Sequence, residues 1–198
     1  MTASLLSKNL TGVDSAGDEG NLVSNTNFHY GLNLRYALSK SWHFLLNYQN
    51  KSYSFDNTQG VIEGEEAFTL TQTSTGVRWV IHPRVAFRFL LNVDEQLAFS
   101  VNASDLAEVY SENLSYASIF YDQVVFMGRS MFSGFKLGYD LPGSGDTISN
   151  RTAVHYGIFM VLDAFEIFYG IRNITLETND LTFTDDESVL NFTYVLRF

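Results

Sequence analysis

Hydrophobic side chains stand at every second position over long stretches of this chain, and this alternation constrains the fold more than any other feature. In residues 28–38, apolar or aromatic side chains at even positions alternate with small or polar ones at odd positions. A β-strand points successive side chains to opposite faces, so a period of two predicts strands with one apolar face. The alternation recurs in residues 42–48, 77–81, 85–93, 135–141, 152–162, 165–171 and 190–198. The sequence therefore predicts an all-β protein.

The spacing of the strands predicts how they are connected. Ten strands are expected, with eight as the alternative count, at residues 2–13, 26–38, 42–55, 67–81, 85–99, 109–124, 129–141, 150–162, 165–177 and 187–198. Short turns near residues 39–41, 82–84, 127–129 and 163–164 alternate with long polar loops, as in barrels with short periplasmic turns and long extracellular loops. Each strand also reaches the ~9–11 residues that a tilted strand needs to cross a bilayer. We predict a transmembrane antiparallel up-and-down β-barrel, with residues 1–198 forming one domain.

The composition of the two strand faces separates a membrane barrel from a soluble one. A soluble sandwich or lipocalin-like barrel would turn its apolar face inward and expose many charges. Here the apolar faces are almost free of charge, and the opposite faces carry Gly, Asn, Gln, Ser and isolated charges, which is too polar for a core. Aromatic residues make up 15% of the chain. Four of them near expected strand ends, Tyr30, Trp42, Tyr53 and Trp79, are candidates for interfacial girdles.

One segment fits no single alternation. In residues 111–130, SENLSYASIFYDQVVFMGRS, either phase places a polar side chain on the apolar face. A β-bulge changes the phase of a strand by one residue. We therefore expect a bulge or an irregular turn near Gly128.

The chain ends in NFTYVLRF, an alternating strand with an aromatic last residue. The apolar positions of this strand are Leu190, Phe192, Tyr194, Leu196 and Phe198. This ending resembles the terminal signal of Gram-negative outer-membrane β-barrel proteins, a pattern that is specific for the class but not for any function within it. The resemblance implies that the barrel-assembly machinery reads the last strand, which then closes against the first.

The expected location and partners follow from this resemblance. The N-terminal sequence MTASLLSKNLTG has no basic start followed by the roughly 7–15 apolar residues of a secretory signal. The resemblance implies export to the bacterial outer membrane with a cleaved signal peptide that is absent from this sequence. The expected partners are outer-membrane lipid and lipopolysaccharide, with the assembly machinery during biogenesis, and any further protein partner is not indicated. A net charge of −10 argues against nucleic-acid binding.

Charged residues divide between the loops and the expected interior. Most of the 22 acids, including Asp140, Asp185 and Glu187, are assigned to long loops or their rims. The expected lumen charges are Arg35, Lys51, Arg78, Arg88, Asp94, Lys136, Glu166, Arg172 and Arg197. Because an unpaired buried charge is costly, we expect Arg78, Arg88 and Arg172 to contact Asp94 or Glu166. The sequence thus predicts a side-chain-filled lumen, with a narrow anion-favouring pore as the alternative.

Catalytic and metal-binding motifs are not evident. The chain has no cysteine, and its acidic stretches lack the spacing of a defined calcium loop. We expect no enzyme activity, cofactor or metal, and a structural, surface-contact or assembly-partner role. The alternative is a lipid-modifying outer-membrane enzyme, in which His29 near a loop rim would pair with an acid.

Overall fold

Twelve β-strands make up the secondary structure of the part of the chain that the structure describes. The computed structural model describes residues 1–14, 19–25, 27–55, 62–63, 67–101, 107–178 and 181–194. The strands are β1 (Thr2–Asp14), β2 (Glu19–Val23), β3 (Asn27–Ala37), β4 (Trp42–Ser54), β5 (Ile62–Glu63), β6 (Ala67–His82), β7 (Val85–Val101), β8 (Ala107–Met127), β9 (Met131–Gly143), β10 (Asn150–Leu162), β11 (Phe165–Glu177) and β12 (Leu181–Tyr194). Within these described ranges, no helix is long and apolar enough to span a membrane.

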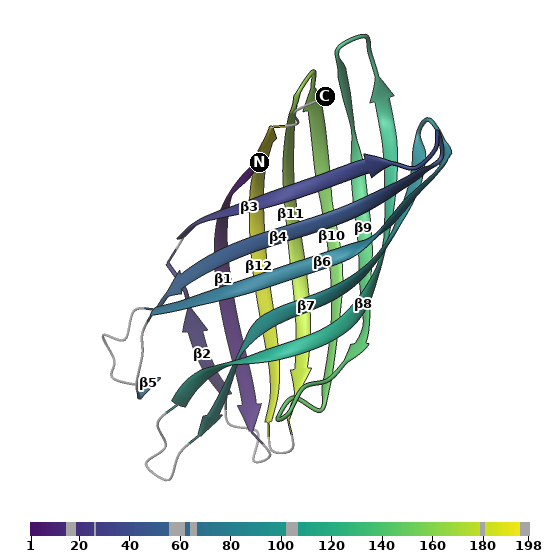
Figure 1. The fold of residues 1–198 in the computed structure, drawn as a ribbon. Coiled ribbons are helices and arrows are strands. Elements are labelled where there is room, and N and C mark those ends of the chain that lie inside the picture. The colour runs from purple at the N-terminus through teal and green to yellow at the C-terminus, as the bar shows by residue number, and fades with distance from the viewer. Residues whose placement is uncertain are drawn as a thin grey trace.

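The sheet closes on itself into a barrel (Figure 1). One edge of β1 pairs with β12 over thirteen positions, from Thr2 opposite Thr193 to Asp14 opposite Leu181. Its other edge pairs with β2 and then with β3, so these two segments together act as one interrupted barrel strand. The described strands therefore form a closed ten-stranded antiparallel barrel, in the order β1, β2/β3, β4, β6, β7, β8, β9, β10, β11 and β12. Strand β5 lies outside this ring and pairs in parallel with the start of β8.

The predicted up-and-down connectivity is confirmed. Short turns join β3 to β4, β6 to β7, β8 to β9 and β10 to β11, and the start of β1 and the end of β12 lie at this end of the barrel (Figure 1). The last of these turns has two residues, Asp163 and Ala164, and Asp163 adopts a positive φ of 51°. A two-residue hairpin turn favours positive φ, and aspartate tolerates that conformation better than most residues.

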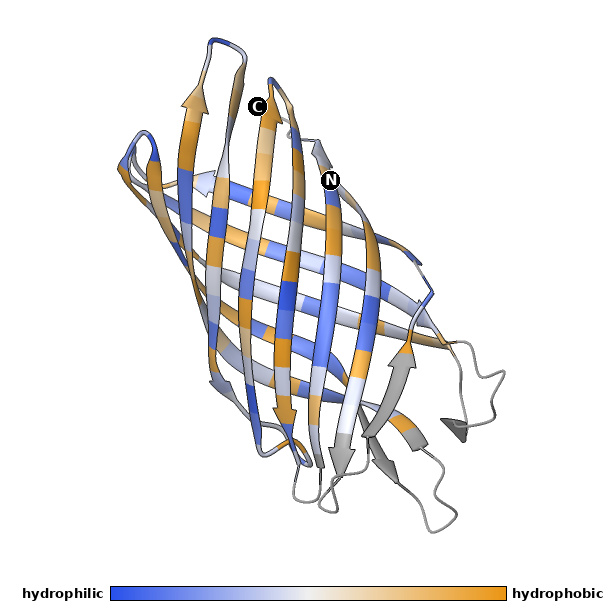
Figure 2. Cartoon of the chain, turned by 180° about the vertical axis from the view of Figure 1, so that it is seen from behind, coloured by the Kyte–Doolittle hydropathy of each residue, from blue (hydrophilic) through white to orange (hydrophobic). Residues whose placement is uncertain are grey.

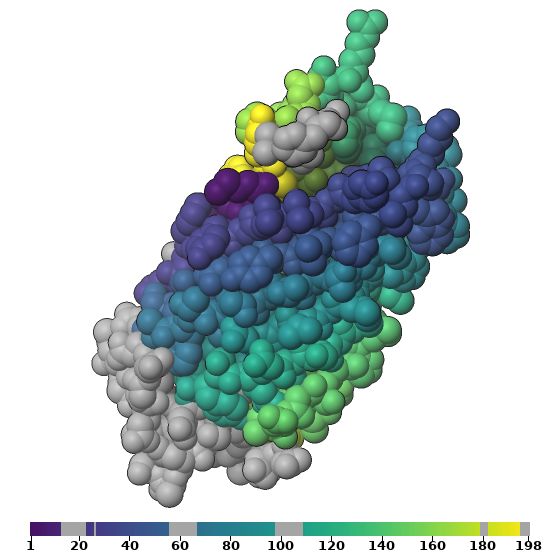
Figure 3. All heavy atoms as spheres, in the orientation of Figure 1, coloured from purple at the N-terminus to yellow at the C-terminus, as the bar shows by residue number. Residues whose placement is uncertain are grey.

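The outer wall of the barrel is apolar, as the alternation predicted. The side chains at alternate positions of the long strands are hydrophobic and exposed. They include Leu32, Leu34, Phe44, Phe89, Leu91, Ile119, Leu137, Val154, Ile158 and Phe192. Figure 2 shows how hydrophobic and hydrophilic residues alternate along these strands. In the space-filling view, the strands from β3 onward form one continuous oblique wall (Figure 3). A barrel with this outer surface is suited to lipid and not to water.

An aromatic ladder runs around the short-turn end of the outer wall. Its five rings belong to consecutive strands β4, β6, β7, β8 and β9, and adjacent centroids lie 5.4–6.5 Å apart. The rings are Trp42, Trp79, Phe87, Tyr121 and Phe135. Such a belt is typical of the membrane–water interface. The prediction for Tyr53 was wrong, because this residue faces the lumen and is 2% exposed.

The expected irregularity in β8 is a bulge at Val125. The register with β9 shifts between Val124 and Phe126, so Val125 and Phe126 are both exposed on the outside while Val124 remains inside. The bulge lies three residues before Gly128, where an irregularity was expected. It explains why no single phase fitted this segment, since a bulge exchanges the two faces of a strand.

Candidate functional site in the barrel lumen

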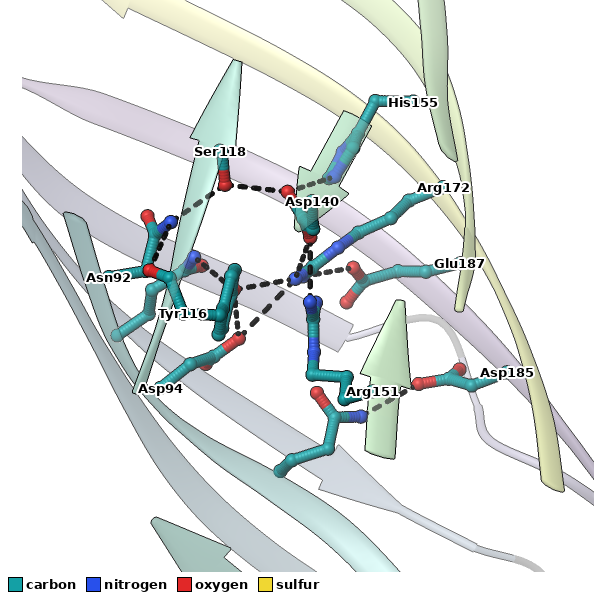
Figure 4. A network of polar contacts seen from close by, with 12 residues as sticks. Asn92, Asp94, Tyr116, Ser118, Asp140, Arg151, His155, Arg172, Asp185 and Glu187 are labelled. Atoms are coloured by element: carbon teal, nitrogen blue, oxygen red, sulfur yellow. Dashed lines mark hydrogen bonds and ion pairs between the residues drawn. The ribbon is translucent and has the colours of Figure 1, made fainter. Parts of the chain in front are cut away.

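The centre of the lumen contains a buried arginine that contacts four strands besides its own (Figure 4). Arg172 of β11 places Nη1 3.3 Å from Glu187 Oε2 of β12. Its Nη2 lies 3.4 Å from Asp94 Oδ2 of β7 and 3.5 Å from Asp140 Oδ2 of β9. The same nitrogen donates a 2.8 Å hydrogen bond to the Tyr116 hydroxyl of β8, which in turn donates to Asp94. Arg172 thus joins three carboxylates that would otherwise repel one another.

Asp140 is the second node of this network, and it is fully buried. Its carboxylate lies 2.8 Å from Arg151 Nη1 and 2.9 Å from His155 Nε2, both on the neighbouring strand β10. Ser118 donates a 2.6 Å hydrogen bond to it from β8. The Arg151 guanidinium also lies 3.7 Å above the ring of Tyr116. A buried carboxylate with this many partners satisfies the requirement that an interior charge be paired.

Two further contacts cross the lumen. Gln96 on β7 donates a 2.9 Å hydrogen bond to Asp185 on β12, and these strands are five places apart in the ring of ten. Tyr53 on β4 donates a 2.6 Å hydrogen bond to Glu187 on β12. Lys8 on β1 completes the layer with a 2.6 Å ion pair to Asp185. Bonds between opposite walls leave the middle of the barrel occupied by side chains.

A layer of buried hydrophobic residues lies between this network and the long loops. Its members pack as one cluster: Leu10, Tyr53, Phe55, Leu70, Leu97, Val109, Leu114, Tyr116, Ile148, Ala153, Ile174, Leu176 and Phe183. Leu10, Leu97, Leu114, Ile148 and Leu176 have no exposed surface. The loop end of the lumen is therefore closed by an apolar core.

The short-turn end of the lumen is different, because its charges are partly exposed. Arg88 makes a 2.9 Å ion pair with Asp122, and Arg78 approaches the same carboxylate to 3.6 Å. Lys136 pairs with Glu166, and these two side chains are 19% and 30% exposed. These charges, together with Arg35 on β3, are called the short-turn cluster below.

The structure brings only some of the expected lumen residues together. Arg172 meets Asp94 in the middle of the barrel, whereas Glu166 pairs with Lys136. The expectation for Arg78 and Arg88 was wrong, because both contact Asp122, which lies on the strand whose phase the bulge obscured. The remaining expected residues lie as follows: Arg35 is exposed near His43, Lys51 is buried close to Glu187, and Arg197 falls outside the described residues.

The sequence assigned three central acids to loops, and this was wrong. Asp140, Asp185 and Glu187 are 0–2% exposed and face the lumen. The last strand begins at Leu181 and not near residue 187, so the stretch LTFTDDES belongs to β12. Phe183, Asp185 and Glu187 alternate on one face and continue the period of two. The segment was nevertheless assigned to a loop because it is rich in acidic residues. Lys8 and Arg151 were missed as well, although each lies on the inward face of its strand.

The terminal strand pattern is described only in part. Leu190, Phe192 and Tyr194 lie at alternate positions of β12, and Phe192 and Tyr194 are exposed. Leu196 and Phe198 lie outside the described residues. Strand β12 pairs with both β11 and β1, so it is the strand that closes the barrel.

His29, the residue considered for catalysis, does not form a reacting set with the described residues, and neither do Ser118 and His155. His29 is 2% exposed, its ring packs 5.2 Å from that of Tyr53, and neither of its nitrogens has a hydrogen-bond partner among the described residues. Ser118 and His155 contact the same carboxylate of Asp140 and are not bonded to each other in the described network. Over the described residues, no group of three or more acidic or histidine side chains could hold a metal ion.

Comparison with known proteins finds similar solved structures but no related sequence family. No family model matches the sequence, and no curated protein matches it. Among solved structures, the chain is similar to the NanC porin, with 9% identity over 98% of this chain and 100% of that one and a TM-score of 0.46. It is also similar to Ail, the attachment invasion locus protein of Yersinia pestis (12% identity, 96% and 95% coverage, TM-score 0.38), and to the outer-membrane protease OmpT of Escherichia coli (9% identity, 98% and 96% coverage, TM-score 0.42).

The closed ring and the apolar wall define the class. A ten-stranded antiparallel barrel with short turns at one end and lipid-facing hydrophobic side chains is the architecture of small Gram-negative outer-membrane barrels. The chain has this architecture, and its subfamily is not defined by the comparisons.

Proposed function

We propose that this protein is a non-enzymatic outer-membrane barrel that is closed to solutes, with a structural, surface-contact or assembly-partner role. The observation that carries the proposal is the set of bonds that cross the lumen. Gln96 reaches Asp185 on the opposite wall, and Arg172 joins β11 to β7 through Asp94. An ion would have to break these contacts to pass, and separating a buried ion pair is costly.

The apolar layer supports the same proposal independently. A hydrated ion that entered from the loop end would first meet side chains with almost no exposed surface, including Leu10, Leu97 and Leu114. Apolar constrictions exclude water and ions without any charged gate. The lumen therefore has two successive barriers of different chemistry.

The proposal of a non-enzymatic role is supported by the state of the histidines. A general base must be within hydrogen-bond reach of the proton that it removes, and it must be accessible to a substrate. His29 is enclosed in the lumen, and His155 faces Asp140 in a buried network. Both arrangements favour a structural role.

Planar-bilayer recording on the purified full-length protein tests the proposal. We expect no steady single-channel current from the wild type. The double variant R172A/Y116A removes the central contacts but leaves the apolar layer in place, so it should conduct little. The triple variant R172A/Y116A/L97A should conduct more than R172A/Y116A or L97A alone. A steady current from the wild-type protein would refute closure.

A narrow pore is the second candidate, and one observation favours it. Apart from Arg35, which is exposed, the charges of the short-turn cluster are 9–30% exposed, so water reaches part of the lumen from that end. A rearrangement of the central network would connect this wet end to the loops. Anion-selective wild-type current in the same recordings would support this candidate over the closed barrel.

A further inference from the structure

Basic residues collect at the short-turn end of the barrel. Of the 11 lysines and arginines in the part of the chain that the structure describes, seven lie there. Three are exposed in or beside the turns and four face the lumen: Lys40, Arg84 and Arg129 in the first group, and Arg35, Arg78, Arg88 and Lys136 in the second. In outer-membrane barrels the short-turn end faces the periplasm.

The lumen charges at this end are not balanced, in contrast to those at the centre. In the middle of the barrel, Lys8, Lys51, Arg151 and Arg172 face an equal number of acids, which are Asp94, Asp140, Asp185 and Glu187. In the short-turn cluster, the four cations are matched only by Asp122 and Glu166 among the described residues. A local surplus of positive charge attracts anions.

Arg35 accounts for much of this surplus. Arg35 is exposed as a residue, and its contact with another side chain in the described structure is a 3.3 Å approach of Nη2 to His43 Nε2. His43 lies opposite Arg78 on the neighbouring strand, and Arg78 and Arg88 both contact Asp122, so Arg35 lies beside this group of charges. An arginine has five N–H donors, so one such contact leaves most of those on Arg35 available to a ligand.

One atom of the cluster is an unused hydrogen-bond donor. Nε of Arg88 is buried and has no hydrogen-bond partner among the described residues. Buried N–H groups without a partner are uncommon and costly. An anion between Arg35 and Arg88 would give such donors an acceptor.

We propose that the short-turn cluster binds a phosphate group presented from the periplasmic side, with Arg35, Arg78 and Arg88 as its ligands. Guanidinium groups form paired, charge-assisted hydrogen bonds with phosphate oxygens, which a single ammonium does not reproduce. The phosphate could belong to a soluble phosphorylated solute or to a phospholipid headgroup of the inner leaflet. Both sources share the chemistry that the cluster recognises.

Calorimetric titration of the detergent-purified full-length protein with glycerol 3-phosphate tests this proposal. The variant R35Q removes a cation that has no acid partner in the described structure, and it should weaken binding about tenfold, the effect of one lost charge-assisted contact. The variant R35K keeps the charge but loses the paired geometry, and it should fall between the wild type and R35Q. The variant E166Q removes a competing carboxylate and should bind more tightly, a gain that misfolding cannot produce.

A rim variant provides the matched control. R129Q removes one positive charge from an exposed turn at the same end of the barrel and should leave the affinity unchanged. Equal losses in R35Q and R129Q, or no binding by the wild type, would overturn the proposal. Native mass spectrometry after extraction from phosphatidylglycerol nanodiscs separates the two sources. Lipid retained by the wild type and lost in R35Q identifies a phospholipid headgroup, whereas glycerol 3-phosphate binding without lipid retention identifies a soluble ligand.

Discussion

The centre and the short-turn end of the lumen use the same kinds of charged side chain in two different environments. At the centre, Arg151 and Asp140 form an ion pair in which both side chains are 0–1% exposed. At the short-turn end, Lys136 and Glu166 form a pair that is 19% and 30% exposed. Both are short contacts between opposite charges, so distance alone does not distinguish them.

The comparison shows that the exposure of an ion pair decides how much the pair contributes to stability. A buried charge that loses its partner cannot be solvated by water, so removing one member is strongly destabilising. A partly exposed charge is screened, and its pair contributes little. We therefore expect the central network to tolerate the loss of a member poorly, and the charges of the short-turn cluster to exchange partners readily.

The largest contrast is expected between two arginine substitutions. R172A leaves Asp94, Asp140 and Glu187 buried around a missing cation, and it should lower the free energy of unfolding by about 3–5 kcal/mol. R35A removes an exposed arginine and should change it by less than about 1 kcal/mol. Urea titration of protein folded into lipid vesicles measures both values. Similar losses in the two variants would remove the distinction between the two ends of the lumen.

The next contrast compares two leucines on one strand. L97A empties space in the apolar layer, where Leu97 has no exposed surface, and it should cost about 2–5 kcal/mol. L91A removes the same atoms from the lipid-facing wall, where Leu91 is 66% exposed. Fluid acyl chains can close over that position, so no cavity remains and the cost should be smaller. The same urea titration decides the order, and a larger loss for L91A would contradict our assignment of the inner face of β7.

The smallest effect is expected at the exposed pair. E166Q removes the carboxylate that Lys136 contacts, and it should change the free energy of unfolding by about 1 kcal/mol or less. D140N is the matched change at the centre, and it should be clearly more destabilising, because Asp140 is buried against Arg151, Arg172 and Ser118. If E166Q lowered the free energy of unfolding as much as D140N, the short-turn cluster would be a second rigid network, and its charges would not exchange partners freely.

The outer wall could be predicted from the sequence because its signal is local. Each lipid-facing residue, such as Leu34 or Ile158, belongs to an alternation visible within its own strand. The short turns and the ten-strand count followed from the same pattern, whereas the start of the last strand did not. The bulge at Val125 was foreseen as an irregularity for this reason, but its position was not.

The central network could not be predicted in the same way, because its members are far apart in the chain. The contact of Arg172 with Asp94 was expected from their opposite charges, but the other contacts across the lumen were not: Gln96 and Asp185 are 89 residues apart, and Tyr53 and Glu187 are 134 apart. Which inward residues meet depends on the tilt of the strands and on which side chains face each other across the lumen. The misplaced acids Asp185 and Glu187 show a second limit, since a run of carboxylates suggests a loop until buried cations such as Lys8 and Arg172 are known to neutralise it.

The pairing of β1 with β12 also has a consequence for the order in which the protein can fold. Thr2 and Thr193 are hydrogen-bonded neighbours although 191 residues separate them, so this seam joins the most distant parts of the chain. Bringing such distant segments together costs about 5 kcal/mol in loop-closure entropy, which thirteen paired positions can offset only after most of them have formed. Until then, β1 and β12 each have an unpaired edge that can bind another chain. Closure is therefore expected to be a late, cooperative and slow step, and the time spent with open edges is when the protein is most exposed to aggregation.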